Sequence, residues 1–148
     1  MKYLFTFILT VLFAAASIGQ NEMPNPIKWS AKSIELEDGS LAIEITADIE
    51  EEWHLYSQFT EEGGPIPTEF TFFTEEIELI EGVEETLEAE KKFSDMFDLN
   101  VVQYEDKAVF IQKYKNIGAT SIKGEVYFMT CDGLRCLPPK AVEFEVEL

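Results

Sequence analysis

The chain has 148 residues and a formal net charge of −18 at pH 7, with 29 acidic and 11 basic side chains. This charge argues against nucleic-acid binding, which requires a basic footprint on the protein surface. The acidic residues are spread along the whole sequence, a pattern typical of a solvated surface. Long-range electrostatic steering toward a basic partner is the alternative that the composition leaves open.

The N-terminal segment has the pattern of a secretory signal peptide. One positive charge, Lys2, precedes an apolar run that extends to Ala16, and small residues follow. The run is shorter than the ~20 apolar residues that a membrane-spanning helix needs, so we expect removal rather than anchoring. Cleavage after Ala16 or after Gly19 fits the pattern, and we predict a signal peptide over 1–19. Residues 20–148 then form a single exported domain that is not embedded in a membrane.

Alternation of apolar and polar residues dominates the next part of the chain. Residues 33–50, "SIELEDGSLAIEITADIE", predict a β-hairpin, because Asp38 and the following glycine separate two alternating runs. "WHLYS", residues 53–57, predicts a short aromatic strand. A glycine- and proline-rich loop follows, and "TEFTFF", residues 68–73, predicts a strand with Phe70 and Phe72 on one face.

The segment 75–100, "EEIELIEGVEETLEAEKKFSDMFDLN", leaves two structures open. One is a strand from Ile77 to Ile80 followed by a loop. The other is a short helix, since Glu, Leu, Ala and Lys favour helix, although Gly82 argues against a long one.

Four further strand-like runs follow this segment, over 101–106, 107–116, 122–131 and 141–148. Short strands separated by frequent turn signals predict an all-β fold, an antiparallel sandwich of seven to nine strands.

The only two cysteines, Cys131 and Cys136, lie around a predicted turn at Asp132 and Gly133. Such a turn between two strands could bring the cysteines to the Cα separation of about 5.5 Å that a disulfide requires. A structural staple, a redox pair and a metal clip are the three interpretations.

The residues favour a redox pair slightly over a staple. Closing so short a loop would stabilise the fold by only about 2 kcal/mol, which makes the tip of a hairpin a weak position for a staple. A metal clip fits least, because zinc takes four ligands and the chain adds only His54 to its two cysteines. The spacing also differs from the C-x-x-C of thioredoxin-like sites.

Two stretches resemble the N-terminal, exported domain of the thiol:disulfide interchange protein DsbD family. "YFMTCDGLRCLPP", residues 127–139, is similar to the family's active-site hairpin, and "EEWHLYSQ", residues 51–58, to its aromatic strand. The resemblance implies an immunoglobulin-like β-sandwich in the periplasm with no bound cofactor. It also implies thiol–disulfide exchange, in which Cys136 engages partners and Cys131 resolves the mixed disulfide. Electrons would come from a separate donor and pass to thioredoxin-like exported proteins.

The family shields its cysteines with a short cap loop, and the nearest match here is "SDMFD", with Asp95 and Phe97 as the corresponding residues. Met96 stands where the family has an acidic residue. Phe93 is an alternative shielding ring, and Phe97 could instead belong to the core.

Three further residues are candidates for supporting roles. The resemblance puts His54 and Tyr56 near the cysteines, where His54 could assist proton transfer and Tyr56 would pack beside the pair. Arg135 could stabilise the Cys136 thiolate, while Asp132 would oppose that effect. The sequence ends at Leu148, directly after the last predicted strand. The resemblance therefore leads us to expect a free-standing domain, or one that has kept the fold and lost its reductase partner.

Overall fold

The computed structural model describes residues 23–148, so the predicted signal peptide and its cleavage site lie outside the described residues. Within this range the chain forms antiparallel strands and no helix. The strands are β1 (Ile27–Glu35), β2 (Leu41–Ile49), β3 (His54–Tyr56), β4 (Glu69–Phe72), β5 (Ile77–Glu85), β6 (Glu90–Ser94), β7 (Leu99–Tyr104), β8 (Lys107–Asn116), β9 (Ser121–Phe128), β10 (Thr130–Cys131) and β11 (Lys140–Glu147).

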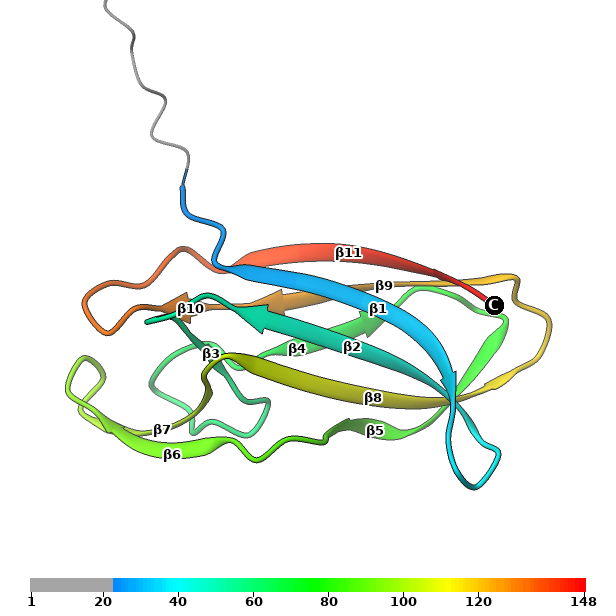
Figure 1. The fold of residues 1–148 in the computed structure, drawn as a ribbon, viewed down its shortest axis with the longest axis horizontal. Coiled ribbons are helices and arrows are strands. Elements are labelled where there is room, and N and C mark those ends of the chain that lie inside the picture. The colour runs from blue at the N-terminus through cyan, green and yellow to red at the C-terminus, as the bar shows by residue number, and fades with distance from the viewer. Residues whose placement is uncertain (1–22) are drawn as a thin grey trace, which may run out of the picture.

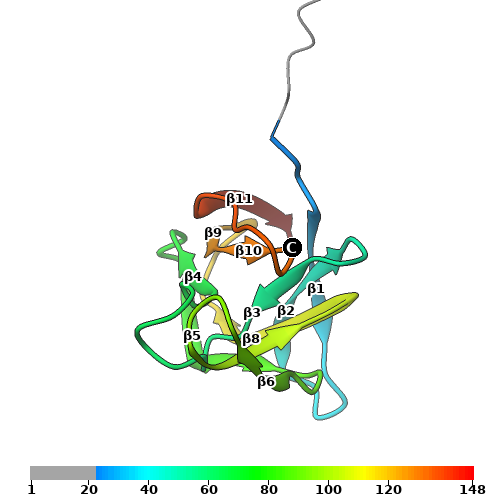
Figure 2. The ribbon, with the colours of Figure 1, turned by 90° about the vertical axis from the view of Figure 1, so that its left-hand side faces the viewer.

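The strands form three sheets, and two of them enclose the main core. One is four-stranded, in the order β1-β2-β8-β5, and the other is three-stranded, in the order β11-β9-β4. The third sheet, β10-β3-β7-β6, extends to the end of the molecule that carries the cysteine hairpin (Figure 1). Seen from that end, the sheets surround a common interior (Figure 2). The predicted antiparallel β-sandwich is therefore confirmed.

Aromatic rings from the two facing sheets pack together in the core. The Trp29 ring from β1 lies 5.2 Å from the Phe128 ring of β9 and 6.4 Å from the Phe70 ring of β4, centroid to centroid. Phe110 from β8 is fully buried and completes the cluster, 4.9 Å from Phe70. Rings at these distances add to the free energy of burial, so this cluster holds the sandwich together.

The two hairpins that the alternation predicted at the ends of the chain are confirmed. β1 pairs with β2 around a turn in which Gly39 has a φ of 81°. β9 pairs with β11 over eight residue pairs without a register shift. Val126 and Val142 are partners in this ladder. The cysteine hairpin is therefore fixed at one end of a long, regular strand pair.

The helix considered for residues 75–100 is wrong, and so is a loop that begins after Ile80. β5 continues to Glu85 past a bulge between Ile80 and Glu84, where Glu81 has a φ of 59°. The Gln112 side chain of β8 donates hydrogen bonds to the carbonyls of Ile80 and Glu81, at 3.1 and 3.3 Å. This side chain satisfies the backbone groups that the bulge leaves unpaired.

The described strands number eleven, more than the seven to nine that the sequence predicted. One reason is that a single alternating run, 122–131, divides into two strands. Met129 separates β9 from β10, and the chain passes there from one sheet into another. Periodicity does not reveal such a change of partner, because the side chains continue to alternate through it.

Candidate functional site

The two cysteines are joined by a disulfide at the tip of the hairpin. Cys131 ends β10, which pairs with β3 so that Cys131 lies opposite His54. The Cα atoms of Cys131 and Cys136 are 4.0 Å apart, and their sulfurs are bonded. The structure therefore contains the pair in its disulfide form, which both the staple and the redox-pair interpretations allow.

The turn between the cysteines is built on Asp132 and Gly133, as predicted. One Asp132 carboxylate oxygen accepts hydrogen bonds from the backbone N–H groups of Arg135 and Leu134, at 2.9 and 3.0 Å. These bonds lower the pKa of Asp132 below its ordinary value. Gly133 has a φ of 84°, which glycine adopts without strain. Hydrogen bonds within the turn itself therefore help to hold its conformation.

The two sulfurs differ in exposure. Cys131 is 1% exposed and belongs to a small apolar cluster with Tyr56 and Val101. Cys136 is half-buried at the rim of the same cluster. Thiol–disulfide exchange requires an attacking sulfur to reach the disulfide, so Cys136 is the accessible atom and Cys131 the protected one.

Tyr56 lies in the wall of the site and packs there. The Phe97 ring contacts it edge-on, with centroids 6.3 Å apart. Burial raises the pKa of Tyr56 to about 12, so its phenol stays neutral near pH 7. A neutral, buried phenol supplies apolar packing beside Cys131, and the partly buried Phe97 packs against this cluster.

His54 contacts the backbone of the cysteine hairpin. Its Nδ1 lies 3.2 Å from the carbonyl oxygen of Cys131, and its Nε2 lies 3.0 Å from Oε1 of Glu105. The Thr130 hydroxyl donates a 2.7 Å hydrogen bond to the His54 carbonyl. His54 thus joins β3, β10 and the β7–β8 turn.

The segment predicted as a cap loop, residues 94–98, spans the tip of the β6–β7 hairpin. The thioether sulfur of Met96 lies 3.2 Å from Sγ of Cys136. Asp95 lines a cavity of about 190 Å³ that also contacts Cys131 and His54. Phe93 lines the same cavity and is 54% exposed. Met96 is thus the residue of this loop whose side chain contacts the sulfur of Cys136.

Two contacts hold the Arg135 side chain. Its Nε donates a 3.3 Å hydrogen bond to Asp132, and its guanidinium lies 5.9 Å from the centre of the Trp53 ring. A cation over an aromatic face is attracted to it, so Trp53 and Asp132 together fix the position of Arg135. Trp53 was not among the predicted site residues, although it lies in the aromatic stretch that was singled out.

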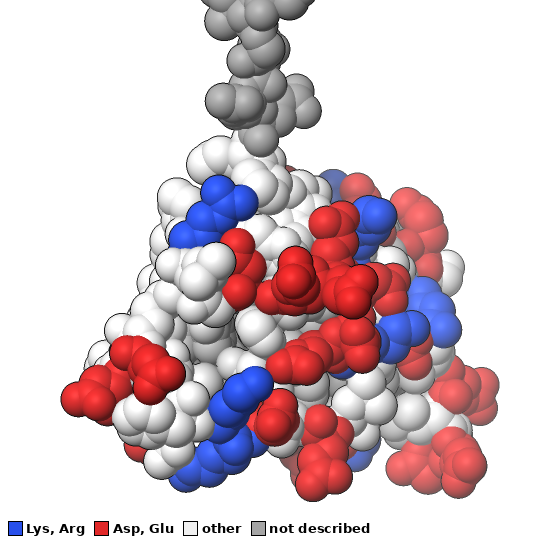
Figure 3. Space-filling model, turned by 60° about the vertical axis from the view of Figure 1, so that its left-hand side comes forward, with Lys and Arg blue, Asp and Glu red and all other residues white. Residues whose placement is uncertain are grey.

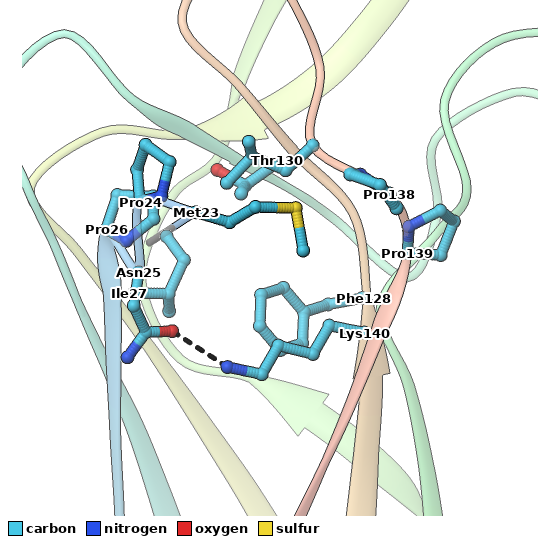
Figure 4. Close-up of a pocket in the computed structure, with 11 residues that line it drawn as sticks. Met23, Pro24, Asn25, Pro26, Ile27, Phe128, Thr130, Pro138, Pro139 and Lys140 are labelled. Atoms are coloured by element: carbon cyan, nitrogen blue, oxygen red, sulfur yellow. Dashed lines mark hydrogen bonds between the residues drawn. The ribbon is translucent and has the colours of Figure 1, made fainter. Parts of the chain in front are cut away.

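A second hollow lies beside the cysteine hairpin, where the chain leaves Cys136. This pocket of about 370 Å³ has a mainly apolar lining that includes Ile27, Phe128 and Leu137 (Figure 4). At its edge the Lys140 ammonium donates a 3.0 Å hydrogen bond to the side chain of Asn25. The hairpin therefore has an apolar hollow beside it as well as the cavity under the cap.

Charge around the site follows the composition of the chain. In Figure 3 the molecule is turned so that the cysteine end comes forward. Acidic side chains cover much of the visible face, with uncharged surface between them. Exposed ion pairs such as Lys91–Glu61, at 3.2 Å, add little stability. Among residues 23–148, no group of three or more His, Cys, Asp and Glu side chains has the arrangement of a metal site.

The comparisons with known proteins agree with this geometry. The profile of the family "Thiol:disulfide interchange protein DsbD, N-terminal" matches residues 15–148, almost the whole chain. The chain belongs to this family. No curated protein sequence matches the chain.

Two solved structures are similar to this DsbD N-terminal family member. The reduced N-terminal domain of DsbD from Neisseria meningitidis has 13% identity and a TM-score of 0.51, with 82% of this chain and 83% of that chain covered. The N-terminal periplasmic domain of ScsB from Proteus mirabilis has 14% identity and a TM-score of 0.59, with 82% and 45% covered. At these identities the likeness concerns the fold, and it confirms the predicted immunoglobulin-like sandwich.

The predicted site residues lie as follows in the structure. The structure brings His54, Tyr56 and Asp95 around the cavity beside Cys131, and it places Phe97 against Tyr56. It directs Arg135 toward Asp132 and Trp53. The chemical roles predicted for these residues remain predictions.

In the part of the chain from 23 to 148, no helix is long and apolar enough to cross a membrane.

Proposed function

We propose that this protein carries electrons between exported proteins by thiol–disulfide exchange at Cys131 and Cys136. The observation that supports this most strongly is the unequal burial of the two cysteines of one disulfide, with Cys131 buried and Cys136 only half-buried. A disulfide that only stabilised the hairpin would need no sulfur within reach of another protein.

The reaction moves two electrons in two exchange steps. A thiolate of the electron donor attacks Sγ of Cys136, the Cys136–Cys131 bond breaks, and Cys131 leaves as a thiolate. A second donor thiolate then attacks the donor sulfur, so the donor leaves as a disulfide and the protein holds two thiols. Toward an oxidised acceptor the steps reverse. Cys136 attacks the acceptor disulfide, and Cys131 then attacks Cys136, which releases a reduced acceptor.

The partners that fit this chemistry are exported thioredoxin-like proteins as acceptors and a separate protein as electron donor. An exported, periplasmic location after removal of residues 1–19 agrees with this function, because disulfides form and persist in oxidising compartments. No bound cofactor takes part, since sulfur carries both electrons.

The first test is an equilibrium of the folded protein with glutathione redox buffers, measured by thiol alkylation. Exchange-active pairs have potentials of about −120 to −270 mV, whereas structural disulfides are typically below about −300 mV. We expect a value in the upper range with rapid equilibration. A pair that stays oxidised in every buffer, or reacts only on unfolding, would instead identify a non-catalytic binding module with a structural hairpin disulfide.

The second test separates the roles of the two cysteines. Cys131→Ser should leave a Cys136 thiol that forms a stable mixed disulfide with an oxidised thioredoxin-like protein, because no second sulfur resolves it. Cys136→Ser should abolish exchange and trap nothing. Non-reducing electrophoresis and mass spectrometry detect both results, and full exchange by the Cys136→Ser protein would contradict the assignment.

A further inference from the structure

The contact between Met96 and Cys136 joins two sulfurs of different chemistry. Their separation is 3.2 Å, and Cys136 carries no thiol hydrogen because it is in a disulfide. The contact is therefore packing of a soft thioether against a disulfide sulfur. Met96 is also 42% exposed, so the same side chain faces the disulfide and the solvent.

The cap loop that carries Met96 is fixed at both sides. The backbone N–H of Asp98 donates a 2.8 Å hydrogen bond to the carbonyl of Ser94, and Asp98 has a φ of 54°. Phe97 packs edge-on against Tyr56 and belongs to the cluster around Cys131. With Phe97 held below the loop, the neighbouring Met96 is held over Cys136.

We propose that Met96 is an oxidation site whose modification controls access to Cys136. The oxidant is a peroxide. The thioether sulfur attacks one peroxide oxygen, the O–O bond breaks, an S=O bond forms, and water leaves with the second oxygen. The sulfur loses two electrons to the peroxide, and the Cys131–Cys136 disulfide keeps its oxidation state.

The product differs from methionine in the property on which the contact depends. A sulfoxide is polar and chiral, and it disrupts apolar contacts that methionine makes. An oxidised Met96 would take its oxygen into solvent and leave the half-buried Cys136 sulfur uncovered. Reductants and partner thiolates would then reach Cys136 more readily, so peroxide would increase the rate at which this protein accepts electrons.

Of the other two described methionines, Met23 provides an internal control. Met23 is 72% exposed and lines the apolar pocket beside the hairpin. Met129 is half-buried beside the cysteine cluster. Met23 should oxidise as readily as Met96 without changing access to Cys136, because no contact joins it to the disulfide.

The experiment measures the rate at which a phosphine reduces the disulfide in the folded protein, before and after treatment with hydrogen peroxide. Peptide mass spectrometry locates the added oxygen, and Trp fluorescence checks the fold. We expect a severalfold faster reduction once Met96 carries one oxygen, and recovery of the slow rate after treatment with methionine sulfoxide reductases.

Three variants make the result specific to Met96. Met96→Leu keeps an apolar cover that cannot be oxidised, so it should reduce slowly with or without peroxide. Met96→Gln imitates the polar sulfoxide and should reduce fast without peroxide. Met23→Leu should respond as the wild type does. An equal peroxide response in Met96→Leu, or a sulfoxide protein that reduces at the original rate, would overturn the proposal.

The effect on partner exchange rests on the proposed function, whereas the phosphine measurement does not. If the Met96 variants change the phosphine rate but no thioredoxin-like protein is ever trapped, the proposed function fails and the shielding stands. If partners are trapped at equal rates with methionine, leucine and glutamine at position 96, the shielding fails and the proposed function stands.

Discussion

The β9–β11 half of the sandwich and the cysteine end are built by different means. β9 and β11 pair over eight residues, and the core beside them buries Phe110 and Val126 almost completely. At the cysteine end β10 has two residues and β3 has three, and Leu134 at the hairpin tip is 91% exposed. The same fold therefore has a long, regular body, formed by the β1-β2-β8-β5 and β11-β9-β4 sheets, and a cysteine end made of short strands and loops.

The difference indicates how stability and reactivity are separated in this molecule. Free energy of folding comes mainly from apolar burial, which the body supplies. A reactive sulfur must be reached by another protein, so it belongs where burial is incomplete. Changes in the body should then alter unfolding, and changes at the cysteine end should alter the rate of exchange.

The largest effect on unfolding should follow Phe110→Ala. Removing this fully buried ring leaves a cavity between the two sheets, and such substitutions typically lower the free energy of unfolding by about 3–5 kcal/mol. Urea denaturation followed by Trp fluorescence measures the loss, and Phe110→Leu is a milder variant if the alanine protein does not fold. The rate of disulfide reduction in the folded protein should not change. A large change would contradict the separation of stability from reactivity.

A strand glycine in the body should give the next largest effect. A Cβ at Gly124 would lie 2.5 Å from the Phe144 ring and 2.7 Å from the backbone oxygen of Thr71. Gly124→Ala should therefore lower the free energy of unfolding by roughly 1–3 kcal/mol through overpacking.

Gly82→Ala is the matched control for this substitution. It lies in the bulge of β5, where a Cβ would meet no atom within 4 Å. This variant should be neutral or slightly more stable in the same urea titration. Equal losses in the two variants would show that the tight approach at Gly124 has no energetic consequence.

Reduction of the disulfide should cost about 2 kcal/mol of unfolding free energy or less, because Cys131 and Cys136 close a short loop. Urea titrations with and without reductant give the difference, with the Cys131→Ser/Cys136→Ser double variant as a control that should not respond to the reductant. A loss greater than that of Phe110→Ala would mean that the cysteine end supports the body, contrary to the comparison.

The smallest effect near neutral pH should come from Tyr56, whose titration alters stability only in alkali. Its pKa rises from the ordinary value of 10.0 to about 12 in the folded protein, so above pH 10 the unfolded chain releases this proton more readily. The contribution of the protonated phenol to the free energy of unfolding is fully present below pH 10 and is lost as the pH rises through about 12. Tyr56→Phe should weaken the alkaline loss of stability, measured by circular dichroism against Tyr127→Phe. Identical profiles for the two variants would contradict this prediction.

The sequence predicted the body well because its signals are local. Alternation and the Asp38–Gly39 turn identified the β1–β2 hairpin, and alternation and the Asp132–Gly133 turn indicated the β9–β11 pair. The β5 bulge was missed because it depends on Gln112, a residue about thirty positions away whose amide satisfies the bulge carbonyls. No local pattern reports such a partner.

At the cysteine end the sequence predicted which residues gather but not which of them touch. The β3–β10 pairing sets His54 opposite Cys131, as the resemblance implied. The Met96 contact depends on the conformation of the cap loop, including the positive φ of Asp98. In the sequence Met96 was visible only as a departure from the family's acidic residue, and Trp53 only as part of an aromatic run.

The near-continuity of β9 and β10 has a mechanical consequence. Only Met129 separates the two strands, so the buried cysteine is attached directly to the central strand of the β11-β9-β4 sheet. A pulling force on a partner bonded to Cys136 would act along the direction of β9 and β11. Ladder hydrogen bonds lie across the strands, so such a load strains many of them together rather than one after another. The cysteine hairpin is therefore anchored to a strand pair that resists such a force through many hydrogen bonds at once, so the sheet should stay in register.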